Sequence, residues 1–177
     1  MLQTNDQNHS QILDLFNREM YRGEFVHGPG NDRLERVGRV RDSFPGSRHW
    51  FRALNVHGVR QLFISVIGVA KRMKNSLSWS NETQGDVLRH LLTSLYSFQT
   101  PNGDLRTYRD NLTVDAAQGQ EAPSVVFLMT KPSQNVASAG FMADANRLNI
   151  ALSRAKKVMI IIGNLRDWNN DGIDKMH

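Results

Sequence analysis

The sequence has no cysteine among its 177 residues. Disulfides, thiolate zinc sites and cysteine nucleophiles are therefore excluded, and a reducing compartment, the cytosol or the nucleus, is the expected location. Long apolar runs are missing too: the longest, VMIII at 158–162, is far shorter than the roughly 20 residues that cross a bilayer. We expect no membrane partner.

The sequence lacks the residue patterns that are usual for metal sites and for hydrolase active sites. The six histidines show neither H-x-H nor H-x-x-x-H spacing, and without cysteine we expect no metal site. Ser153 has neither a neighbouring histidine nor the surrounding glycines of a nucleophile elbow. A hydrolase built on this serine is therefore not favoured.

The composition is that of one ordinary folded domain. Hydrophobic residues make up 40% and charged residues 22% of the chain, which is near the usual globular mixture. The net charge of +5 and the sequence pI of about 9.9 favour an anionic partner, such as a nucleic acid or a nucleotide.

Helical and strand patterns alternate along the chain. Apolar spacing predicts helices over 10–20, with Ser10 as the N-cap, and over about 82–98, with Ser80 or Asn81 as the cap. Short apolar runs predict buried strands within 60–70, 124–130 and 156–164, and a helix over 144–156 lies between the last two. The alternation predicts an α/β fold with a mainly parallel sheet and helices on both faces.

Two polar groupings near the end of the chain could bind phosphate. On the helix at 144–156, Arg147, Ala151 and Arg154 follow one stripe, so both guanidiniums are expected to point the same way. The loop at 115–121 begins where a strand ends, and its Gly119 allows close approach of a ligand to the backbone. The alternative is that both arginines lie on a solvated helix face.

Three consecutive segments resemble a known family. They are TVDAAQGQE from residue 113, SVVFLMT from residue 124 and GFMADANRLNIALSRAKKVMIIIGN from residue 140. Their order and spacing resemble the stretch from motif V to motif VI of superfamily 1 helicases, in the group of the nonsense-mediated-decay helicase and senataxin. The resemblance is specific over 113–164 and weaker upstream.

The resemblance implies the following organisation. Residues 1–55 would hold a first helix and an irregular arginine-rich segment, and residues 56–177 a partial second RecA-like helicase domain. Motif V would occupy 113–121 and motif VI 146–156. The partners implied are single-stranded RNA or DNA and a first RecA-like domain supplied elsewhere.

The resemblance also implies roles for single residues. Arg154 would be the catalytic arginine finger, worth about three to five orders of magnitude in rate in other phosphoryl-transfer enzymes. The nucleotide-binding residues would be Gln118, Gly119, Glu121 and Arg147. The nucleic-acid-binding residues would be Thr113 and Asp115, at the start of motif V.

The sequence departs from the family in two respects. It contains no G-x-x-x-x-G-K-[ST] and no Asp-Glu pair of the Walker B kind, so ATP and Mg²⁺ would be bound only together with the missing first RecA-like domain. The chain alone is not expected to hydrolyse ATP. The family's strand between the helix ending near Phe98 and motif V has no counterpart, which predicts a shortened sheet lacking one central strand.

Two other interpretations stay open. A run of arginines with interspersed aromatics, from Arg33 to Arg52, could bind nucleic acid or could be a solvated surface. The chain could accordingly be a non-catalytic nucleic-acid-binding module, or a degenerate helicase remnant. The sequence does not distinguish RNA from DNA.

Overall fold

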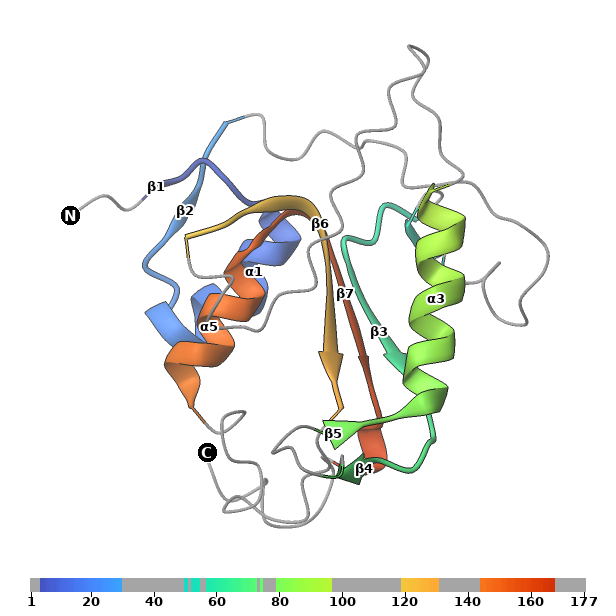
Figure 1. Ribbon diagram of the computed structural model, residues 1–177. Coiled ribbons are helices and arrows are strands. Elements are labelled where there is room, and N and C mark those ends of the chain that lie inside the picture. Colours follow the sequence, from blue (N-terminus) through green and yellow to red (C-terminus); the bar gives the residue numbers. More distant parts are fainter. Residues whose placement is uncertain are drawn as a thin grey trace.

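Among the residues that the structure describes, the main sheet is three-stranded and parallel (Figure 1). In the computed structural model its order is β3–β7–β6, and the strands are β3 Gln61–Ser65, β7 Ala155–Gly163 and β6 Ala122–Met129. The structure describes residues 4–29, 50, 52–54, 57–72, 74, 79–96, 119–130 and 144–167. The segments 113–118 and most of 30–52 lie outside them.

Helices cover both faces of the sheet (Figure 1). Helices α1 (Ser10–Tyr21) and α5 (Ala145–Ser153) pack on one face, and α3 (Glu82–Tyr96) packs on the other. The predicted α/β class, with a mainly parallel sheet and helices on both faces, is therefore confirmed, and the arrangement is consistent with a RecA-like fold. Two small strand pairs and a short 3-10 helix are also described: β1 Thr4–Asn5 with β2 Val26–His27, β4 Lys71–Arg72 with β5 Trp79–Ser80, and η2 Leu165–Asp167.

Strand β7 is the centre of the core. It pairs with β3 on one side and β6 on the other, and its side chains feed both hydrophobic clusters. Val158, Ile160 and Ile162 face Val87 and Leu91 of α3. Met159, on the opposite face, packs with α1 and α5. The prediction of a buried strand at 156–164 is confirmed.

The prediction of full burial is wrong for the other two strands. In β3 only Ile64 is buried, and Phe63 is 37% exposed; β6 has no fully buried residue, and Leu128 is 36% exposed. Within the described residues each of these strands has only β7 as a neighbour in the sheet. An apolar run cannot reveal this, because burial depends on how many neighbours a strand acquires. Pro123 lies where the β6–β7 register shifts, as suits a residue with no N–H to donate.

Of the three predicted helix ends, one is confirmed and two lie elsewhere. Asn81 caps α3, because its Oδ1 accepts from Gln84 N at 3.1 Å. At α1 the predicted Ser10 cap is wrong: Ser10 is already helical, and His9 is the N-cap, with Nδ1 accepting from Gln11 N at 3.2 Å. The predicted helix over 144–156 ends at Ser153, because the β7 ladder takes the chain from residue 155 onward.

Candidate functional site

Two segments that are distant in the sequence meet at the amino ends of β6 and β7. The residues before β6 contact the residues between α5 and β7 through three interactions. Ala122 N donates to the Arg154 carbonyl at 3.1 Å, and the Arg154 guanidinium donates to the Gln120 carbonyl at 3.3 Å. The Lys156 ammonium lies 2.8 Å from the Glu121 carboxylate. The end of the predicted motif V and the end of the predicted motif VI therefore form one junction.

The Arg154 side chain is held in this junction by hydrogen bonds from all three nitrogen atoms of its guanidinium group. Its Nε donates to the Ile150 carbonyl at 2.9 Å, one terminal nitrogen donates to Ser153 Oγ at 2.8 Å, and the other to the Gln120 carbonyl at 3.3 Å. A guanidinium carries five N–H groups, so these contacts leave two available. None of the three acceptors is a carboxylate, and the positive charge therefore stays available to an anion.

Arg147 lies at the opposite end of α5. Its guanidinium is 3.8 Å from the carboxylate of Asp144, the N-cap of the helix, and both side chains are nearly half exposed. Seven residues of helix separate the two arginines by about 10 Å along the axis. The structure therefore does not bring Arg147 and Arg154 together at one point, although the stripe predicted a shared direction.

Gly119 and Glu121 both lie beside Arg154, in the segment entering β6. Gly119 has φ +80°, a conformation that favours glycine, and a Cβ built there would meet no heavy atom of the described residues within 4 Å. Its backbone is thus open to approach. The Glu121 carboxylate is paired with Lys156 rather than with Arg154. The other predicted site residues, Thr113, Asp115 and Gln118, lie outside the described residues.

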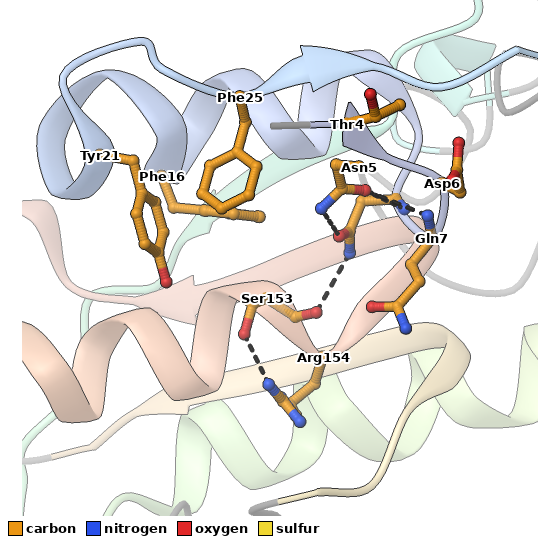
Figure 2. A pocket seen from close by; sticks show the side chains of 10 residues that line it. Thr4, Asn5, Asp6, Gln7, Phe16, Tyr21, Phe25, Ser153 and Arg154 are labelled. Atoms are coloured by element: carbon orange, nitrogen blue, oxygen red, sulfur yellow. Dashed lines mark hydrogen bonds between the residues drawn. The ribbon is translucent and has the colours of Figure 1, made fainter. Parts of the chain in front are cut away.

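A cavity of about 410 Å³ opens next to Arg154 (Figure 2). Phe16, Tyr21 and Phe25 form its aromatic side, with the Tyr21 and Phe25 rings edge to face at 4.6 Å between centroids. The amino-terminal segment and the end of α5 complete it. The further lining residues are Thr4, Asn5, Asp6, Gln7, Asn8 and Ser153.

The amino-terminal side of this site could not be predicted from local sequence patterns. Asn8 is 3% exposed and bonds to backbone carbonyls of residues 153 and 155, and His9 N donates to the Lys156 carbonyl at 2.7 Å. Tyr21 accepts from Asn149 of α5 at 2.7 Å. These partners are more than a hundred residues away in the chain, and an asparagine in a polar segment carries no local sign of such contacts.

The described residues contain neither a group of metal ligands nor a membrane-spanning helix. No three or more His, Asp or Glu side chains are grouped there in a way that could hold a metal ion. None of the helices described there is both long enough and apolar enough to cross a bilayer.

Comparison with known proteins finds similarity to an AAA domain and to helicases. Residues 109–166 match the family described as AAA domain. An uncharacterized ATP-dependent helicase of Methanocaldococcus jannaschii is 29% identical over 121 residues, covering 58% of this chain and 17% of that protein. Helicase SEN1 of Saccharomyces cerevisiae is 23% identical over 187 residues, covering 89% of this chain and 8% of that protein.

A third relative is more similar over a shorter stretch. A homologue of regulator of nonsense transcripts 1 from Neurospora crassa is 44% identical over 52 residues, covering 29% of this chain and 5% of that protein. The chain spans less than a fifth of the length of each of these three curated relatives. The chain is thus similar, over parts of its length, to proteins named as helicases and to a regulator of nonsense transcripts.

Proposed function

We propose that the chain is the second RecA-like half of a superfamily 1 helicase, and that Arg154 is its arginine finger. One observation carries the proposal: the guanidinium of Arg154 joins the end of the motif V segment to the end of motif VI, through the Gln120 carbonyl and Ser153 Oγ. An arginine held in this way is preorganised, so its charge can act on a phosphate without first being ordered.

The residues present fit one side of an ATP site. Arg154 supplies a charged fork with two N–H groups left over, and Gly119 leaves its backbone open. The sequence has no phosphate-cradling loop and no Walker B carboxylates for Mg²⁺. ATP and Mg²⁺ would therefore be held mainly by a first RecA-like domain, with this chain closing over the γ-phosphate.

Each residue would then have a distinct task. ATP supplies the phosphoryl group, and Arg154 stabilises the negative charge that develops on it as the bond to the leaving group breaks. Arg147, Gln118, Gly119 and Glu121 would support the nucleotide side of the cleft. Thr113 and Asp115 would couple it to single-stranded RNA or DNA, with hydroxyl contacts to phosphate that position the strand without reading its sequence.

A second candidate function is nucleic-acid binding without catalysis. The β4–β5 hairpin presents exposed Lys71 and Arg72, with exposed Lys74 after them and Val69, 75% exposed, before them. Exposed cations grouped in this way suit the phosphate backbone of a nucleic acid. Such a module would bind with a steep salt dependence and show no response to ATP.

ATP hydrolysis by a reconstituted mixture tests the proposal. The chain would be mixed with a separately expressed first RecA-like domain and single-stranded RNA, and the wild type compared with Arg154→Ala. We expect activity only in the mixture, and a loss of at least about 1,000-fold in the variant. Arg89→Ala, on the exposed side of α3 beside Asp86, is the matched control and should keep full activity.

If the mixture does not hydrolyse ATP although the chain unfolds cooperatively in urea, the catalytic proposal is contradicted. Salt-dependent binding of RNA would then favour the second candidate function. Absence of cooperative unfolding would instead favour the interpretation of a helicase remnant.

A further inference from the structure

The connection between α5 and β7 is a single residue, and that residue is Arg154. Helix α5 ends at Ser153 and β7 begins at Ala155. Helices commonly end with a glycine in the left-handed conformation, whose backbone satisfies the last carbonyls. Here Arg154 is the C-cap in a right-handed conformation, with φ −74° and ψ −23°. The carbonyls at this end therefore need other partners.

Asn8 supplies the donor for two of them. Its side-chain Nδ2 donates to the Ser153 carbonyl at 3.1 Å and to the Ala155 carbonyl at 2.6 Å. The Arg154 carbonyl between them accepts from Ala122 N at 3.1 Å. Three consecutive carbonyls are thus bonded, and the peptide planes on both sides of Arg154 are fixed.

Asn5 sets the orientation of the Asn8 amide. Asn5 Nδ2 donates to Asn8 Oδ1 at 3.0 Å, and Asn5 Oδ1 accepts from Asn8 N at 2.9 Å and from Gln7 N at 3.1 Å. With its oxygen engaged by Asn5, the Asn8 amide can only turn its N–H groups towards Ser153 and Ala155. Asn8 itself is 3% exposed, so water does not compete for these bonds.

We propose that Asn8, oriented by Asn5, is a positioning residue for Arg154. It holds the backbone on both sides of Arg154 and thereby keeps the guanidinium directed at the segment before β6. The inference rests on the proposed function for its effect on catalysis, whereas the positioning itself does not. A displacement of about 1 Å in a group that acts in the transition state can cost about 100-fold in rate.

Asn8→Asp is the sharpest variant, because it keeps the size and one oxygen of the side chain. It replaces the donor by an acceptor facing two carbonyls at a helix carboxyl end, where negative charge is unfavourable. The matched control is Gln11→Ala. Gln11 also bridges distant backbone, from α1 to the Gly58 carbonyl and Arg60 N, but has no contact with Arg154.

Two measurements on the full chain test the proposal. The first is the NMR signal of the Arg154 Nε–H group, which reports its bond to the Ile150 carbonyl without any nucleotide. We expect Asn8→Asp to shift or broaden this signal and Gln11→Ala to leave it unchanged. The second is ATP hydrolysis in the mixture with the first RecA-like domain, where Asn8→Asp should lower kcat by about 10- to 100-fold and change KM for ATP by less than about threefold.

Combining Asn8→Asp with Arg154→Ala separates positioning from general damage. If Asn8 acts through Arg154, the double variant should have the kcat of Arg154→Ala alone. An equal fold-loss in both backgrounds, or an unchanged Arg154 signal in a folded Asn8→Asp protein, would overturn the proposal. If Asn8→Asp does not fold, Asn5→Ala decides in the same way, since it removes the bond that orients the amide and leaves the Asn8 donor itself in the chain.

The outcomes also separate this inference from the proposed function. A wild-type mixture without ATPase activity, together with a lost Arg154 signal in Asn8→Asp, would refute the helicase proposal and support the positioning of Arg154. An active wild-type mixture, together with an unchanged Arg154 signal and unchanged kcat in Asn8→Asp, would support the helicase proposal and refute the positioning of Arg154.

Discussion

Helix α5 carries an arginine near each end, and the two ends are built differently. At the amino end, Asp144 caps the helix and contacts Arg147 at 3.8 Å, and both side chains are more than 40% exposed. At the carboxyl end, Asn8 at 3% exposure fixes the backbone, and Arg154 makes three hydrogen bonds. The first arrangement stabilises a helix in water, whereas the second fixes the direction of a charge. The difference supports the proposal that Arg154, rather than Arg147, is the arginine finger.

The largest expected difference between the two ends is catalytic. Lysine keeps the charge of arginine and loses the planar fork. In the reconstituted mixture we expect Arg154→Lys to lower kcat by about 100-fold, against less than about tenfold for Arg147→Lys. Steady-state ATP hydrolysis with single-stranded RNA measures both. Equal losses would show that the two ends are functionally alike.

The second difference is in stability at the carboxyl end. Asn8→Ala leaves two carbonyls without this donor, and we expect the free energy of unfolding to fall by about 1–3 kcal/mol. Urea denaturation followed by circular dichroism measures it. Asn17→Ala is a useful comparison, since Asn17 is 6% exposed and its side chain bonds the backbone of Phe25 at both N and O. A change below about 0.5 kcal/mol for Asn8→Ala would contradict the account of this end.

The amino end should be less sensitive. Asp144 Oδ1 accepts from Asn146 N and Arg147 N at 3.0 and 3.3 Å, both in exposed positions. Asp144→Ala should therefore cost about 1 kcal/mol of unfolding free energy, as is usual for an N-cap. Asp144→Asn, which keeps the acceptor, is the control and should retain nearly full stability. If both variants lose the same free energy of unfolding, Asp144 does not act as the N-cap acceptor described here.

The smallest expected effect concerns the ion pair beside Arg154. The Lys156 and Glu121 side chains are 42% and 25% exposed, so water screens much of their attraction. Glu121→Gln should lower the free energy of unfolding by less than about 1 kcal/mol, and the loss should shrink at high salt. Denaturation at two ionic strengths measures it. A loss that salt does not change would indicate that the glutamate has another structural partner.

Local patterns predicted the elements well where periodicity was strong. Helices α1 and α3 and strand β7 lie where apolar spacing placed them, because one apolar stripe or one apolar run is enough to bury each against the core. Motif spacing likewise placed Arg154 beside the segment at 119–121. The absence of one central strand stays a prediction, because the segment concerned lies outside the described residues. The roles of Thr113, Asp115 and Gln118 stay predictions for the same reason.

What the sequence could not predict depends on partners far along the chain. The end of α5 at Ser153 is set by pairing of β7 with β6, and its capping comes from Asn8, 145 residues away. The partial exposure of β3 and β6 follows from their position beside β7. None of these partners leaves a trace in a window of neighbouring residues.

Strand β7 is central in space and the last of the three strands in the chain. During synthesis, β3 and β6 therefore leave the ribosome before the strand that joins them exists. Until residues 155–163 emerge, both present unpaired backbone edges on which wrong pairing can begin. Folding should accordingly be late and slow for a chain of this size, since each pairing of the sheet waits for the same distant segment. Translation pauses before residue 155 would then lengthen the period in which the unfinished chain depends on chaperones.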